Sequence, residues 1–183
     1  MSLRAAFIAL LLPLCAAASV QGADRPVVDA AWVNVTDTTL EVNARVVFPQ
    51  DERMSAALAE GATVHLDLQV GVARKSRYWF DADLVETTLR RALSFNPLTL
   101  RFELKEDAGL RSFDSLQEAL DAAGMVDAWP VALREPLDAE GVYRVRVRAT
   151  TRRGNLASSL KALLPWSDGG IRHSEWSTWT LPR

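Results

Sequence analysis

Alternation of apolar and polar residues on both sides of an Asn-Pro pair is the feature that most constrains this fold. Asn96-Pro97 divides the stretch from Leu84 to Leu104 into two halves. In each half, most apolar side chains occupy every second position and so share one face of a strand, with Arg91 as the exception on that face. This pattern predicts a β-hairpin with one buried face. Loops of two or four residues both place apolar opposite apolar, and the longer pairs Phe95 with Leu100. Because proline excludes a type I′ turn, we favour the longer loop or a cis bond.

Similar alternation along the rest of the chain predicts an antiparallel fold. Strands are expected over 27–48 as a first hairpin, over 63–72, 142–153 and 171–181, and briefly within 129–136. Short helices are expected over 51–60, 114–123 and 156–164, and a polar turn over 105–109. The second helix begins after a cap at Asp114 or Ser115. Few helices among many strands favour a mainly β, single antiparallel β-sandwich-like domain with two or three short helices, with a small α+β domain as the alternative.

The first 23 residues are predicted to lie outside that domain. Arg4 precedes an apolar run over 5–18, and small residues then lead to Gly22 and Ala23. The run is too short to cross a bilayer, so it predicts a secretory signal peptide over 1–23 and a single β-rich domain over 24–183. We therefore expect export to the periplasm, and a mature chain that can associate with a membrane but not span it.

Charge and cysteine content exclude several classes of function. Cys15 is the only cysteine and falls within the predicted signal peptide, so the mature chain has neither disulfides nor thiolate chemistry. Without Arg4, the mature chain carries 20 basic and 23 acidic side chains, and its formal charge is 20 − 23 = −3. That balance gives no case for a nucleic-acid partner.

Two stretches are similar to the signature of an uncharacterised bacterial family, domain of unknown function family 4390. They are Ser-Phe-Asn-Pro-Leu-Thr over 94–99, and Leu164-Pro165 followed by Trp-Ser-Thr-Trp over 176–179. The sequence departs from the family at Phe95, where a hydroxylated aromatic is common, and near Leu164-Pro165, where only Lys161 remains of a basic group. The resemblance implies an exported single domain and no known reaction. It also implies a role in envelope sensing, because members of the family tend to be encoded near a membrane histidine kinase.

Candidate catalytic and metal-binding groups are sparse. The two histidines are His65, two positions before Asp67 on a polar strand face, and His173, followed by Ser174-Glu175. There is no G-x-S-x-G nucleophile elbow, and the acidic group at 81–86 lacks a calcium-loop pattern. We interpret both histidines as strand or turn residues. The sequence therefore predicts no catalytic residue, no metal site, no cofactor and no enzyme; a hydrolase built on either histidine is the weakest alternative.

One row of arginines and one tryptophan are the predicted binding residues. Arg144, Arg146 and Arg148 share one face of the strand expected over 142–153. Guanidinium groups at this spacing can bind carboxylates or anionic headgroups, and they can equally be neutralised by acidic neighbours in the sheet. Among six tryptophans, Trp32 and one of the C-terminal pair are expected in the core, and Trp166 is expected to be exposed.

These features predict a non-enzymatic envelope module that binds or senses another protein through Arg144, Arg146, Arg148 and Trp166. The resemblance suggests a membrane sensor kinase as the partner. The alternative is a periplasmic carrier of an apolar or amphipathic ligand, which requires an apolar cavity of several hundred cubic ångströms between the sheets.

Overall fold

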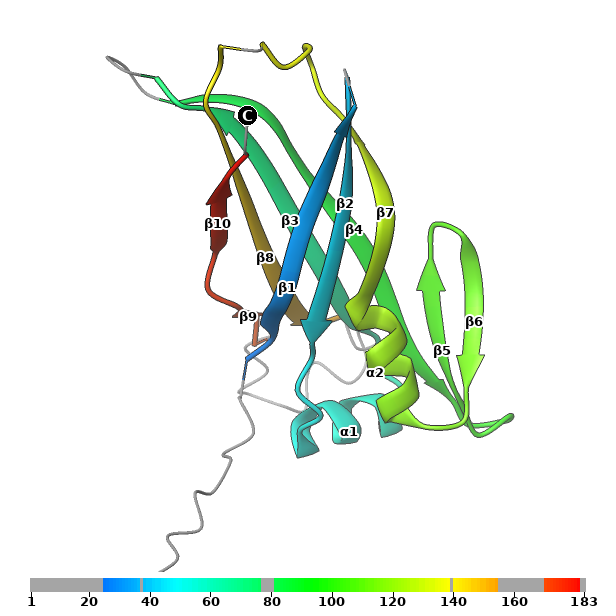
Figure 1. The fold of residues 1–183 in the computed structure, drawn as a ribbon. Helices are drawn as coiled ribbons and strands as arrows, with labels where there is room; N and C mark the ends of the chain where they lie inside the picture. The colour runs from blue at the N-terminus through cyan, green and yellow to red at the C-terminus, as the bar shows by residue number, and fades with distance from the viewer. Residues whose placement is uncertain (1–24, 37, 77–80, 139, 155–169, 182–183) are drawn as a thin grey trace, which may run out of the picture.

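A computed structural model describes residues 25–36, 38–76, 81–138, 140–154 and 170–181, and these form a mainly β structure with two short helices (Figure 1). The elements are β1 (Val27–Thr36), β2 (Thr39–Val47), α1 (Glu52–Ala59), β3 (Val64–Arg74), β4 (Ala82–Asn96), β5 (Arg101–Glu106), β6 (Gly109–Phe113), α2 (Leu116–Gly124), β7 (Met125–Ala132), β8 (Tyr143–Arg153), β9 (Arg172–His173) and β10 (Ser177–Thr180). The helix expected over 156–164 lies outside the described residues.

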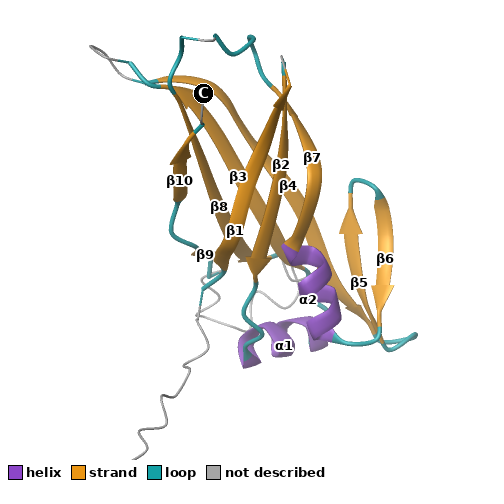
Figure 2. Ribbon diagram, viewed as in Figure 1, coloured by secondary structure: helices purple, strands orange, loops and turns teal. Residues whose placement is uncertain are grey.

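Two antiparallel sheets pack face to face. The smaller has the order β1-β2-β7, and the larger has the order β10-β8-β3-β4-β5-β6, with β9 beside β8. The smaller sheet lies across one face of the larger, and both helices lie at one end of the pair (Figure 2). The mainly β antiparallel prediction is therefore confirmed. No helix in the described ranges is both long and apolar enough to cross a membrane.

The core lies between the sheets and consists of the residues that alternation assigned to the inward faces. Leu66, Leu68 and Val70 of β3 are buried, as are Val145 and Val147 of β8. Strand β2 contributes every second residue from the opposite sheet. Because alternate side chains of a strand point to opposite faces, the polar residues between these positions lie on the outer faces of the sheets.

The central hairpin forms as predicted, but its register is different. Its loop has four residues, 97–100, yet Phe95 pairs with Phe102 and not with Leu100. The turn begins one residue late because Asn96 pairs within the sheet, and its side-chain oxygen accepts the N–H groups of Leu98 at 3.0 Å and Thr99 at 3.4 Å. Leu100 closes the turn at φ 55°, and no described peptide bond is cis.

Four other details of the fold differ from the expectations. The expected polar turn forms at 107–108, but strand β6, which follows it, was not predicted. Strand β7 begins directly after α2 and is longer than expected, and the last strand is divided into β9 and β10. Trp32 was expected in the core but is 52% exposed, because it pairs with Asn43 on the outer face of the smaller sheet. Trp179 is the C-terminal tryptophan that packs against the core.

Both described helices begin after a side chain that caps them, and the second does so at one of the two caps expected. Asp51 accepts the N–H of Met54 at 2.7 Å, and Ser115 rather than Asp114 caps α2, accepting the N–H of Glu118 at 3.2 Å. Such caps satisfy backbone donors that have no partner within the helix.

Candidate functional site

The predicted arginine row lies on the outer face of β8, and each member has a partner on a neighbouring strand or connection. The pairs are Arg144 with Asp81 at 3.1 Å, Arg146 with Glu86 at 3.1 Å, and Arg148 with the side-chain oxygen of Gln69 at 2.6 and 2.9 Å. Arg144 and Arg146 are therefore neutralised by acidic neighbours, which is the second of the two outcomes considered from the sequence, whereas Arg148 is bound by an uncharged amide.

Two further contacts hold the row against the sheet. The side chain of Arg146 crosses β3 over Gly71, where an added Cβ would lie 2.6 Å from the Arg146 Nε. The guanidinium carbons of Arg146 and Arg148 lie 5.2 and 4.4 Å from the centre of the Trp176 ring. Stacking of this kind favours cations, so Trp176 orders two of the three arginines. Trp166, the other predicted binding residue, lies outside the described residues.

The most exposed apolar element is the loop between β4 and β5, residues 97–100, which we call the hairpin tip. Leu98 is 93% exposed and Leu100 is 70% exposed. The hairpin tip contains no charged side chain, and Asn96 satisfies two of its backbone N–H groups. The alternation had assigned both leucines to the buried face, so the sequence missed this surface.

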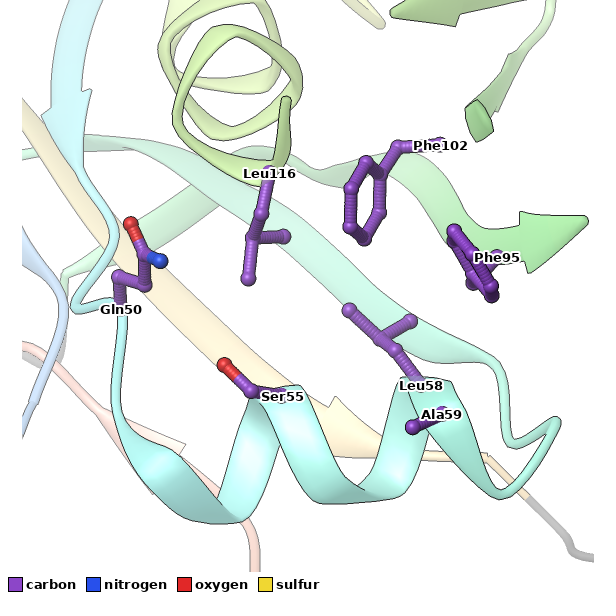
Figure 3. A pocket seen from close by; sticks show the side chains of 7 residues that line it. All are labelled: Gln50, Ser55, Leu58, Ala59, Phe95, Phe102 and Leu116. Atoms are coloured by element: carbon purple, nitrogen blue, oxygen red, sulfur yellow. The ribbon is translucent and has the colours of Figure 1, made fainter. Parts of the chain in front are cut away.

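An apolar cleft of about 210 Å³ lies between α1, the start of α2 and the β4–β5 hairpin (Figure 3). Its lining residues are Gln50, Ser55, Leu58, Ala59, Phe95, Phe102 and Leu116. Phe95 and Phe102 form a cross-strand pair with ring centres 5.1 Å apart. Because the Phe95–Phe102 pair lies directly beside the Asn96–Arg101 pair that precedes the hairpin tip, the apolar cleft and the hairpin tip are parts of the same hairpin.

Among the described residues, no hydrogen bond joins either histidine to a serine. His173 Nδ1 lies 3.0 Å from Thr150 Oγ1, while the Ser174 hydroxyl accepts the N–H of Ala149 and donates to the carbonyl of Glu175. Asp67 forms an ion pair at 3.7 Å with Arg152. Within the described residues, no three His, Asp or Glu side chains gather as a metal-ion site requires.

Removal of His173 should flatten the fall in stability on acidification. Desolvation, and then the Arg148 cation, lower the pKa of His173 below its usual 6.5. His173 therefore binds a proton more readily in the unfolded chain than in the folded one. The neutral imidazole contributes to the free energy of unfolding above pH 6.5, and this contribution is lost as the pH falls through the folded-state pKa. Urea unfolding at pH 7 and pH 5 should show a smaller loss in His173→Gln than in the wild type. Equal losses would contradict the prediction, and His65→Gln controls for removal of an imidazole.

Comparison with known proteins agrees with the resemblance in the sequence. The family model described as Domain of unknown function (DUF4390) matches residues 23–180. No curated protein and no solved structure gives a significant match. Since the matched range covers most of the 183 residues, including both sheets, the chain belongs to the DUF4390 family.

Proposed function

We propose that this protein is a non-enzymatic module of the cell envelope that binds another envelope protein through the hairpin tip. The observation that carries the proposal is the exposure of Leu98, at 93%, beside Leu100, at 70%. Large apolar side chains that project together from an ordered element are typical of interaction sites. The predicted signal peptide supports the envelope location, and the sensor kinase implied by the family resemblance is the first partner to test.

Burial of the hairpin tip in a partner would have a low desolvation cost. Pro97 has no N–H group, and the Asn96 side chain already accepts those of Leu98 and Thr99. Complete burial of each leucine contributes about 1.5–3 kcal/mol, from which the cost of association is subtracted. The apolar cleft beside the hairpin tip offers a place for a side chain of the partner.

The arginine row is a second proposed contact surface and is less strongly supported. A partner carboxylate would have to compete with Asp81, Glu86 and Gln69, which already bind the row. Exposed ion pairs of this type are weak, so such competition is feasible but gains little net free energy. The two surfaces can be separated by mutation.

Capture from envelope extract should depend on the hairpin tip. With the mature chain as bait, Leu98→Ser combined with Leu100→Ser should reduce recovery of the partner at least about tenfold, since about 1.4 kcal/mol gives that factor. Leu110→Ser is the matched control, because Leu110 is an exposed leucine on β6. The triple change of Arg144, Arg146 and Arg148 to Gln tests the arginine row. Equal capture by the wild type and the tip variant, or no capture by the wild type after cross-linking in cells, would refute the proposal.

A carrier of an apolar ligand is the second candidate, and the apolar cleft is its supporting observation. The cleft volume of about 210 Å³ is below the several hundred cubic ångströms that the hypothesis required, and the cleft lies beside the helices at one end of the sheets. Ligand pockets usually measure about 300–1,000 Å³. We therefore rank protein binding above ligand transport.

A further inference from the structure

The edges of the two sheets are protected to different degrees. Within the described chain, the smaller sheet ends in β1 and β7, and the larger ends in β10 and β6. An open edge presents unpaired N–H and C=O groups to any other strand, and proteins protect such edges with short strands, prolines, bulges or charges. An edge that lacks these features is a candidate site for strand pairing.

Three of these edges have such protection. Strand β10 has four residues, and β6 has five, including Arg111. Strand β7 contains Pro130 and an irregularity at Ala128, whose φ is 46° and whose N–H donates to the side-chain oxygen of Asn43 at 2.9 Å. Length, proline and distorted backbone therefore oppose pairing at these edges.

Strand β1 is long and, over most of its length, unprotected. It has ten residues, and its irregularity is confined to the step between Val28 and Ala30. From Ala31 to Thr36 it pairs continuously with β2 and contains neither proline nor a charged residue. No strand of the described chain pairs with its outer edge. Trp32 is 52% exposed and Val35 is 46% exposed on this same strand.

We infer that β1 pairs antiparallel with β1 of a second copy of this chain, which joins two three-stranded sheets into one of six strands. A two-fold axis places the same residues on both sides and closes the assembly at two copies. With the axis at Val33, Trp32 lies opposite the partner copy's Asn34, and Ala31 lies opposite the partner copy's Val35. This inference does not depend on the hairpin tip, which lies in the other sheet.

Charge favours a second copy over an unrelated strand. Because residues 31–36 are uncharged, no like charges meet when the segment pairs with itself in this register. The flanking Asp29 is already near Arg45 of the same sheet, with an N···O distance of 3.8 Å. An arriving strand with many charged residues would find no opposite charge within 31–36. The chemistry of the edge thus matches an uncharged strand such as β1 itself.

Sedimentation of the mature chain, residues 24–183, tests the inference. We expect a dimer at micromolar concentration, and an increase of at least about tenfold in its dissociation constant when Trp32 and Asn34 are both changed to Lys. Lysine at these positions adds repulsion between copies at a site that faces solvent in the monomer. Leu98→Lys is the control, since it adds a lysine at the hairpin tip, away from β1, and should leave the dimer intact.

A thiol introduced into β1 provides an independent measurement. The mature chain has no cysteine, so Asn34→Cys is its only thiol, and a short bis-maleimide should link two copies, while Leu98→Cys should not link. A monomeric wild type up to submillimolar concentration would overturn the inference. A dimer that persists in the double-lysine variant, or is lost in Leu98→Lys, would also overturn it, and the last result would place the interface at the hairpin tip. Whether the Leu98 and Leu100 variant still captures a partner tests the proposed function and does not test this inference.

Discussion

Replacing Arg91 with methionine should lower the free energy of unfolding by about 3 kcal/mol, whereas the same change at Arg90 should alter it by less than about 0.5 kcal/mol. The two residues are neighbours on β4 but face opposite ways. Arg91 lies opposite Leu66, on the inward face, and Arg90 lies opposite Asp67 and is exposed. The comparison therefore separates the loss of a buried ion pair from the loss of an arginine as such.

The large effect at Arg91 follows from its partners. Its Nε lies 2.7 Å from a carboxylate oxygen of Glu106 in a close ion pair, although the N–H is not aligned as a hydrogen bond, and the two side chains are 12% and 13% exposed. Its Nη1 donates to the carbonyl of Ala123 in the last turn of α2. Desolvation lowers the pKa of Arg91, and the Glu106 charge opposes that change. Without Arg91, the one cation that the described residues still place beside the Glu106 carboxylate is Arg111, at 3.5 Å.

Urea unfolding of the single variants and of Arg91→Met combined with Glu106→Gln measures this interaction. Because breaking a buried pair costs most through the charge left behind, the double variant should be more stable than Arg91→Met alone. Equal losses for Arg90→Met and Arg91→Met would show that the inward position carries no special cost. A double variant less stable than Arg91→Met would contradict the ion-pair explanation.

Alternation identified the strands and inward residues well, because burial imposes it directly. Leu66 and Val147, on the apolar faces of the strands expected over 63–72 and 142–153, are buried accordingly. Register was not predictable in the same way, since the turn is set by a side chain: Asn96 binds the N–H groups of the following residues and moves the loop by one position. Trp32 was misplaced because alternation gives two faces without saying which is inward, and the smaller Ala31 and Val33 occupy that face.

The candidate surfaces could be predicted only in part. The arginine row was evident from its spacing, but its neutralisation depends on Asp81 and Glu86, which reach Arg144 and Arg146 only through the pairing of distant strands. The hairpin tip was missed because the apolar pattern continues through the turn, so Leu98 was assigned to the buried face. Leu98 is exposed because it lies in the turn, and the turn is positioned by the Asn96 side chain rather than by the periodicity.

Gly124→Ala should lower the free energy of unfolding by about 2 kcal/mol, although alanine is the better helix former. Gly124 is the last residue of α2, and an added Cβ would overlap the carbonyl oxygen of Val46 in β2. The obstructing atom belongs to backbone within a sheet, so it cannot move aside as a flexible side chain would. Relief of the overlap requires α2 to separate from β2, with loss of the contacts of Leu120 and Ala123 in the core.

The sign of the effect decides between two properties of this glycine. If glycine served only to end the helix, alanine would stabilise the fold by up to about 1 kcal/mol. If the close approach of α2 to β2 requires glycine, alanine destabilises the fold despite its higher helix preference. Comparison of Asp121→Ala with Asp121→Gly, at an exposed position of the same helix, measures the helix preference, and thermal or urea unfolding gives the steric contribution of Gly124→Ala as the difference. A stabilised Gly124→Ala protein would mean that α2 does not lie against the backbone of β2, and that the end of the core formed by α2 is packed differently.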